Sequence, residues 1–398
     1  MPANAGFGDA VDMANLPLID APAVDYGSEE PAMARYREEG TRRALALGNR
    51  GPIRFDAAGR VHPSILEAYS RCGFYVFERA IAQEELDDIE RDLVDMLDRL
   101  PATRGAPVDR HGRPALGADC KSQPIVWVQP LADPLGGTSH ARGRHQVKMF
   151  EPTAPKDAPE WVVQQIIGPS QFSDACLRVS GHPQLLAIAA SIYGEDMTPF
   201  HEALWVKQAR LGGSVAWHQD AMTHWGSPDC DENAHGLSFM VQLYGCNAAN
   251  GLWVVPGSHR AKADIRAMAA EAGSDRLLGA VPLICGPGDV AMHNRQVLHC
   301  SFANTSADLR VTVNFGFHRR KSILGVVTGD AKNPAVFDEA RVRARSRLIT
   351  YAIDARRQRF PNETPYRYQP LAAEENRWRW TAAAREEIKD YNLQDLFI

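Results

Sequence analysis

The chain has 398 residues, of which 44% are hydrophobic and 23% are charged, and its formal net charge is −5. This composition is ordinary for a globular protein, and the charge gives no overall attraction to nucleic acid or to an anionic membrane, so we expect neither partner. Seven cysteines are scattered without a Cys-x-x-Cys pair, which excludes a zinc ribbon and a disulfide framework and fits a reducing compartment.

Targeting signals are not apparent in this sequence. The first residues lack a basic stretch followed by an apolar run, and no run of about 18 apolar residues occurs. We therefore expect a cytoplasmic location and no membrane span.

The first half of the chain predicts an arm, one strand and several helices. Residues 1–60 lack a sustained period and form the predicted N-terminal arm, within which 35–47 could be a short helix. Residues 73–77 are apolar and prone to β structure, and the helically spaced apolar side chains that follow predict a buried helix. This stripe consists of Leu86, Ile89, Leu93, Met96 and Leu100.

The region from 101 to 201 is less regular. Residues 136–145 are small, polar and basic, which suits either a loop over a site or a simple solvated loop. Residues 146–150 predict a strand, and 160–193 predict a helical region that is broken near Pro169 and again near 181–183.

From Glu202 onward the sequence consists of short apolar runs separated by turn residues, which is typical of antiparallel β structure. Eight such runs fit a double-sheet jelly roll. The predicted class is mainly β with flanking helices (α+β): a double-stranded β-helix (jelly-roll, cupin-like) core with helices outside, although a sheet with one solvated face would alternate similarly. The runs are 203–208, 215–220, 237–244, 252–255, 277–283, 289–293, 296–302 and 309–317.

The chain after Arg320 predicts a helical C-terminal extension. Apolar residues at helical spacing share one side, and arginines occupy the other, where nearby acids favour a solvated face over nucleic-acid binding. The aromatic tail should dock on the core or on a second copy, which would form a homo-oligomer. The predicted domains are thus the arm 1–60, the jelly-roll core 61–320 and the extension 321–398. The arginines are Arg341, Arg343, Arg345, Arg347, Arg356 and Arg357.

A candidate metal site lies in Ala216-Trp217-His218-Gln219-Asp220. His218 and Asp220 are two residues apart, so on a strand they point to the same face. With His299 they would form a two-His, one-carboxylate set, which suits non-haem Fe(II). His293 is the main rival for the third ligand. The other histidines, namely His224, His235, His259 and His318, are more typical of loops, core or substrate side.

Several motifs together resemble the phytanoyl-CoA dioxygenase family, a branch of the Fe(II)/2-oxoglutarate oxygenases. The resemblance covers about 74–317 and depends on motif order and spacing, because no single motif is specific. The motifs are Trp217-His218-Gln219-Asp220, Asn250-Gly251, Pro256-Gly257-Ser258-His259, Gly288-Asp289-Val290, His299-x-Ser301, Asn304-Thr305-Ser306 and Arg310.

This resemblance implies Fe(II), 2-oxoglutarate and O2 as cofactors, with His218, Asp220 and His299 as the catalytic metal ligands. Arg310, eleven positions after His299, would bind the distal carboxylate of 2-oxoglutarate, for which an Arg fork is suited. The alternative for Arg310 is a surface residue that caps the turn at Asp308. Ser301 and, less directly, Gln208 would contact the same cosubstrate.

The implied reaction is hydroxylation of an aliphatic C–H bond in a small molecule, with succinate and CO2 as coproducts. Asp220 favours oxygenation, because related halogenases have a small residue there. Two alternatives remain: desaturation, epoxidation or ring formation at the same site, and a non-catalytic jelly-roll binding protein. Met222, Trp225 and Lys148 are the predicted substrate residues. The basic loop with Arg142 and Arg144 indicates an anionic substrate group.

Overall fold

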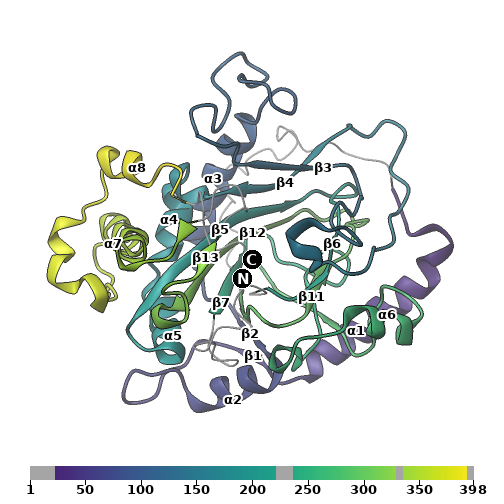
Figure 1. Cartoon of the computed structure of the whole chain (residues 1–398), viewed down its shortest axis with the longest axis horizontal. Helices are drawn as coiled ribbons and strands as arrows, with labels where there is room; N and C mark the ends of the chain where they lie inside the picture. The colour runs from purple at the N-terminus through teal and green to yellow at the C-terminus, as the bar shows by residue number, and fades with distance from the viewer. Residues whose placement is uncertain (1–22, 221–235, 329–334, 392–398) are drawn as a thin grey trace, which may run out of the picture.

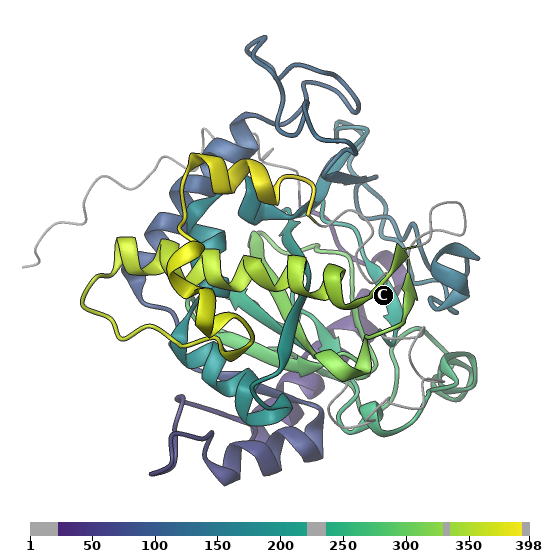
Figure 2. The same cartoon turned by 60° about the vertical axis from the view of Figure 1, so that its left-hand side comes forward.

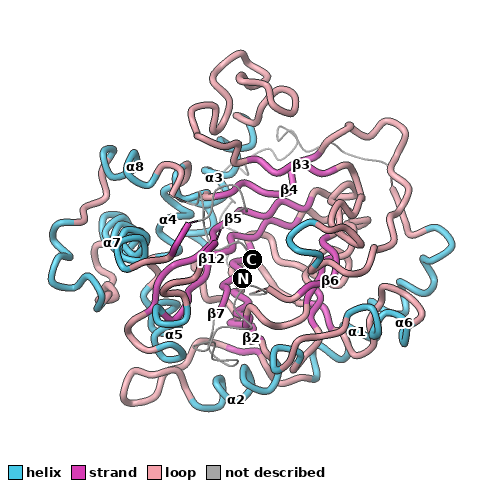
Figure 3. Tube along the Cα trace, viewed as in Figure 1, coloured by secondary structure: helices cyan, strands magenta, loops and turns pink. Residues whose placement is uncertain are grey.

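The computed structural model describes residues 23–220, 236–328 and 335–391. Its centre is a pair of sheets that together contain the eight predicted strands (Figures 1 and 3). The large sheet has the order β1-β2-β10-β7-β12-β5-β4-β3, and the small sheet has the order β6-β11-β8-β9. From β5 to β12 the chain crosses repeatedly between the two sheets, with the consecutive strands β8 and β9 paired in the small sheet, which confirms the predicted double-stranded β-helix. These strands are β5 (Met197–Lys207), β6 (Val215–His218), β7 (Gly236–Gln242), β8 (Trp253–Val254), β9 (Val281–Pro282), β10 (Val290–Asn294), β11 (His299–Ser301) and β12 (Arg310–Arg319).

Strand β12 shows why the barrel forms. Val311, Val313, Phe315 and Phe317 all belong to the main hydrophobic cluster on the helix side of the large sheet. Arg310 and Thr312, on the opposite face, are buried as well. A sheet with one solvated face would leave those polar side chains exposed, so the alternation here marks a barrel with a polar interior.

Four further strands extend the large sheet, and two form a separate hairpin. The predicted strand at 73–77 is confirmed by β2. The helical region predicted for 160–193 is wrong at its start, because Val162–Ile167 is a strand, β4. Its valines and isoleucines are β-branched and suit a buried strand. A short apolar run of this kind cannot be distinguished from a helix by its periodicity alone. The added strands are β1 (Arg50–Gly51), β2 (Phe74–Phe77), β3 (Ile125–Val128) and β4 (Val162–Ile167), with β13 (Val327–Thr328) and β14 (Ala335–Val336) forming the hairpin.

The expected strand at 146–150 is also wrong. This segment is irregular, and side chains bind its backbone: the N–H of Met149 donates to the Asp133 carboxylate at 2.8 Å, and the N–H of Phe150 donates to the Asp275 carboxylate at 2.8 Å.

Helices cover the outside of both sheets. α3, α4, α5 and α7 lie along the large sheet, whereas α1 and α6 lie near the small sheet (Figure 1). The described helices are α1 (Glu30–Ala46), α2 (Pro63–Cys72), α3 (Gln83–Asp98), α4 (Asp174–Ser180), α5 (Pro183–Tyr193), α6 (Ile265–Ala272), α7 (Glu339–Arg359) and α8 (Ala382–Ile388). Short 3-10 helices are η2 (Gly27–Glu29), η3 (His140–Gly143), η4 (Pro169–Gln171), η5 (Ser258–Arg260), η6 (Arg320–Ser322) and η7 (Gln369–Arg377). None of the helices in the described ranges is long and apolar enough to span a membrane.

The N-terminal helix α1 packs tightly on the small sheet. The Tyr36 ring stacks on the Trp253 ring with centroids 4.4 Å apart. A Cβ added at Gly40 would lie 2.6 Å from the Trp253 ring, so only glycine allows this approach. The helix thus braces the sheet that carries β6 and β11.

The extension helix α7 lies across the outer side of the large sheet (Figure 2). Its predicted apolar side is confirmed, since Val342, Leu348 and Ile349 are buried. The prediction of a fully solvated arginine face is wrong for Arg345 and Arg356, which are buried. Arg356 pairs with Glu85 of α3 at 2.9 Å and with Glu363 at 2.9 Å. Glu85 is 271 positions away in the sequence, whereas Glu363 is seven positions away.

We expect Glu85→Gln to lower the free energy of unfolding by about 2 kcal/mol, because a hydrogen bond to a charged group contributes roughly 1.5–3 kcal/mol. Urea unfolding of the full chain measures the change. The matched control is Glu84→Gln, whose partner Arg359 is more exposed and whose effect should stay below about 1 kcal/mol. Equal effects of the two variants would show that the buried pair with Arg356 contributes no more than a surface pair.

Candidate metal centre

Three buried side chains, His218, Asp220 and His299, converge at the ends of β6 and β11. The two strands are antiparallel neighbours, and His299 is the direct partner of His218. One ligand atom from each residue can be chosen so that all lie within 4.8 Å of one another. His218 Nε2 is 3.5 Å from Asp220 Oδ1, and His299 Nε2 is 4.0 Å from Asp220 Oδ2. The structure therefore brings together the set that the sequence indicated.

Both imidazoles are held with the same nitrogen toward this cluster. His218 Nδ1 donates to the carbonyl oxygen of Ala216 at 2.7 Å, and His299 Nδ1 donates to that of Val297 at 2.9 Å. Protonation at Nδ1 leaves Nε2 as the free lone pair, which is the arrangement found at histidine metal ligands.

Gln219 fixes the backbone between His218, the last residue of β6, and Asp220, which lies just beyond that strand. Its Nε2 donates to the carbonyl oxygen of Gln296 at 2.7 Å, and its Oε1 accepts from the N–H of Ala263 at 2.8 Å. Asp220 N–H donates to the carbonyl oxygen of Arg295 at 3.0 Å. Because neighbouring side chains alternate, Gln219 is anchored on one side while His218 and Asp220 share the other.

The protonation states suit a divalent cation. Burial, followed by the nearby His299, holds the pKa of His218 well below its usual value, and burial also lowers the pKa of His299. Burial alone would raise the pKa of the Asp220 carboxyl, but Arg144 and His299 outweigh it and hold that pKa below its usual value. Neutral imidazoles and an ionised carboxylate are the ligand forms that metals require.

His293, the rival ligand, is on β10 of the large sheet. Its ring centre is 5.3 Å from that of His299, and its Nδ1 is 3.2 Å from the carbonyl oxygen of Asn294. It is not among the residues whose ligand atoms converge. The geometry therefore favours His299 as the third ligand.

Beyond His299, a buried cationic pocket lies between the sheets. Arg310 is the direct strand partner of Lys207 on β5, and they are 3% and 4% exposed. Arg310 is therefore no surface residue capping the turn at Asp308. Its Nη1 donates to the carbonyl oxygen of Asn250 at 3.1 Å, and its buried Nε has no acceptor within the described ranges. Lys207 Nζ donates to Ser301 Oγ at 2.7 Å.

Neither Arg310 nor Lys207 has a carboxylate partner among the described residues. Burial lowers the pKa of both groups, and for Lys207 the neighbouring Arg310 lowers it further. Two buried cations with spare donors fit an anion such as the distal carboxylate of 2-oxoglutarate. Gln208, also predicted here, is buried with its Oε1 unpartnered.

Lys207 was missed by the sequence analysis, although a lysine inside the apolar run 203–208 was a usable signal. We expect Lys207→Met to raise the 2-oxoglutarate concentration needed for half-saturation by about tenfold, since one charge-assisted hydrogen bond is lost. Titration of 2-oxoglutarate in the presence of Fe(II) measures this. A half-saturation point equal to that of the unaltered chain would exclude Lys207 from the pocket.

The structure gives a different outcome for each of the predicted substrate residues. Met222 and Trp225 lie outside the described residues, as does the side chain of Arg142. Lys148 lies at the surface, where its Nζ donates to Glu151 Oε1 at 2.7 Å and to the carbonyl oxygen of Asp133. These contacts orient a loop, so a substrate role for Lys148 stays a prediction without support from them. Arg144 does reach the metal centre, 2.9 Å from Asp220 Oδ1.

Comparisons with known proteins found one curated relative and several similar solved structures. L-proline trans-4-hydroxylase of Streptomyces griseoviridis is 24% identical over 182 residues, covering 39% of this chain and 68% of that enzyme. EctD from S. alaskensis, solved with 2-oxoglutarate and 5-hydroxyectoine, is similar over 68% of this chain and 80% of its own, with 20% identity and a TM-score of 0.47. SnoN, a non-haem alpha-ketoglutarate-dependent epimerase from nogalamycin biosynthesis, is similar over 65% of this chain and 82% of its own, with 16% identity and a TM-score of 0.42.

A family model described as phytanoyl-CoA dioxygenase (PhyH) matches residues 69–312, which is more than half of the chain. The family predicted from motif order is thereby confirmed, and with it the cofactors Fe(II), 2-oxoglutarate and O2. The chain belongs to the phytanoyl-CoA dioxygenase family and is an Fe(II)/2-oxoglutarate-dependent oxidoreductase.

Proposed function

We propose that this enzyme hydroxylates an aliphatic C–H bond of a small molecule, with His218, Asp220 and His299 as the iron ligands. The observation that carries the proposal is the convergence of these three side chains beside the buried, carboxylate-free pair Arg310 and Lys207. The relative that hydroxylates L-proline supports a small substrate.

The residues have separable tasks. His218 and His299 present Nε2 because their Nδ1 atoms are bonded to backbone carbonyls, and Asp220 adds the negative charge that holds a dication. Such a set would hold the metal with three protein ligands and would leave it accessible to the cosubstrate and oxygen. Iron and 2-oxoglutarate, when bound, supply oxidation by O2 coupled to decarboxylation of 2-oxoglutarate to succinate.

The remaining polar groups orient the cosubstrate. Arg310 would hold the distal carboxylate of 2-oxoglutarate through two parallel hydrogen bonds. The hydroxyl of Ser301, which accepts a hydrogen bond from Lys207, would contribute a further hydrogen bond to the same carboxylate. Both lie in the buried interior, where exclusion of water strengthens these contacts.

The reaction type is tested in two steps. A thermal-shift screen of small metabolites, with a redox-inert divalent metal and 2-oxoglutarate present, identifies a substrate. Turnover of that compound with Fe(II) under isotopically labelled O2 should add one labelled oxygen atom to the product. Loss of two hydrogen atoms without oxygen would replace hydroxylation by desaturation, and binding without any product would favour a non-catalytic jelly-roll protein.

A further inference from the structure

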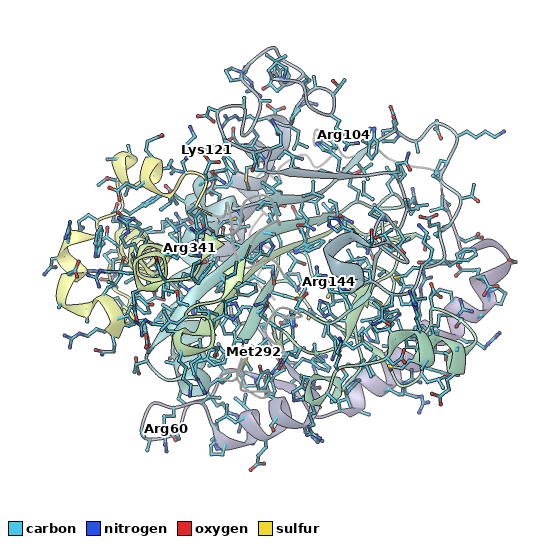
Figure 4. All side chains as sticks on the ribbon, viewed as in Figure 1. Arg60, Arg104, Lys121, Arg144, Met292 and Arg341 are labelled. Atoms are coloured by element: carbon cyan, nitrogen blue, oxygen red, sulfur yellow. The ribbon has the colours of Figure 1, made fainter. Side chains whose placement is uncertain are left out.

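Two adjacent residues of the loop after η3, Arg144 and His145, contact the metal centre from outside the strands that build it. Arg144 Nη1 donates to Asp220 Oδ1 at 2.9 Å. The His145 ring centre is 4.6 Å from that of His218. Figure 4 shows Arg144 between the two sheets, near the centre of the view. The proposed hydroxylation uses neither side chain.

His145 is an unpaired polar group at this position. Its side chain is completely buried, with 0% exposure, and neither ring nitrogen has a hydrogen-bond partner among the described residues. A buried imidazole left without partners destabilises the fold unless a ligand or water satisfies it. Because it is next to His218, a molecule in front of the metal would lie within its reach.

Arg144 is a largely covered cation, with 13% of its side chain exposed, and its charge is only partly balanced. Its ion-pair partner within the described ranges is Asp220, the same carboxylate that the metal would use. A single carboxylate shared between a dication and a guanidinium leaves the guanidinium short of negative charge. Its Nε is also buried and has no acceptor among the residues that the structure describes. The fork of Arg144 therefore has donors and charge available for a second anion.

The cationic pocket for 2-oxoglutarate does not explain these two residues. Arg310 and Lys207 come from β12 and β5, and Lys207 is tied to Ser301 of β11. Arg144 and His145 come from the loop and contact the β6 ligands instead. The site thus has two separate cationic ends, and 2-oxoglutarate needs only one.

Building on the proposed function, we infer that Arg144 and His145 form the substrate end of the site and select a small carboxylic acid. Arg144 binds the carboxylate of the substrate, for which its planar fork is suited, and His145 hydrogen-bonds a polar group next to it. The competing role for Arg144 is structural: it would only orient Asp220.

The first test is a screen for compounds that stimulate 2-oxoglutarate consumption by the Fe(II)-loaded full chain. The library consists of carboxylic acids paired with their primary amides, and it includes L-proline with L-prolinamide. Stimulation should be confined to acids, and Arg144→Gln should raise the half-saturation concentration of a stimulating acid at least about tenfold. Arg144→Lys should recover part of the loss. The comparison variant is Arg60→Gln, a surface arginine paired with Asp56 whose side chain is 74% exposed, which should change the half-saturation concentration less than about twofold.

The inference is overturned if no acid stimulates, if amides stimulate as well as acids, or if Arg144→Gln leaves the half-saturation of the acid unchanged. A second measurement needs no substrate: Mn(II) titration of the metal-free Arg144→Gln chain. We expect a dissociation constant that is unchanged or lower, because a cation competing for Asp220 is removed. A tenfold higher constant would make Arg144 a positioning residue for Asp220. Absence of any Fe(II)-dependent 2-oxoglutarate consumption in the unaltered chain would instead contradict the proposed function.

Discussion

Asp220→Ala should abolish hydroxylation, because the metal loses its anionic ligand. The variant leaves two neutral imidazoles and the Arg144 guanidinium, which repels a dication once its partner is gone. Even indirect supports of metal ligands contribute about 10–100-fold to affinity, so removal of a ligand should weaken Mn(II) binding by more than about 100-fold. Metal titration and product formation measure the two effects.

The matched control for this change is His293→Gln, which alters a buried neighbour of His299 that is not in the converging set. Its Mn(II) affinity should stay within about threefold of the unaltered chain, well below the change expected for loss of a ligand. Undiminished product formation by purified Asp220→Ala would refute the triad, and loss of metal binding in His293→Gln alone would move the third ligand to β10.

Arg310→Leu should raise the 2-oxoglutarate requirement by roughly two to three and a half decades. The reason is that the distal carboxylate would be buried without its partner, and breaking a buried pair from one side costs roughly 3–5 kcal/mol, at about 1.4 kcal/mol per decade. Mn(II) affinity should change far less, since Arg310 is not among the converging ligands.

Arg310→Lys provides the comparison. It should recover only part of the affinity, because a point charge cannot make the two-pronged contact. Titration of 2-oxoglutarate against both variants is the measurement. An unchanged half-saturation point in Arg310→Leu would mean that Arg310 is not the anchor, and Lys207, its strand partner, would become the leading candidate.

The sequence was most informative where one period covers a whole strand. In β12 the alternation of Val311, Val313 and Phe315 with polar residues located the strand and its two faces, whereas the interior position of Arg310 is shown only by its burial in the structure. His218 and Asp220 were found in the same way, because a spacing of two on a strand has one geometric meaning. His299 followed from motif order, and the structure makes it the direct partner of His218.

Other features depend on contacts that no local pattern records. The strand Val162–Ile167 has an apolar run that fits a helix equally well, and only its pairing with β3 and β5 decides its conformation. Arg356 is buried because Glu85, 271 positions away, meets it. His145 lies in a loop whose sequence has no periodic apolar pattern, so its burial beside His218 could not be predicted. The domain boundaries, the homo-oligomer and the cytoplasmic location stay predictions.

The assignment of the iron site is tested most directly by measuring succinate release. The full chain is loaded with Fe(II) and 2-oxoglutarate without oxygen and is then aerated, in parallel with His299→Ala. We expect the unaltered chain to convert 2-oxoglutarate to succinate only when both iron and oxygen are present, and His299→Ala to release none. Iron-independent succinate, no succinate at all, or equal release by His299→Ala would contradict the assignment of His218, Asp220 and His299 as the iron site.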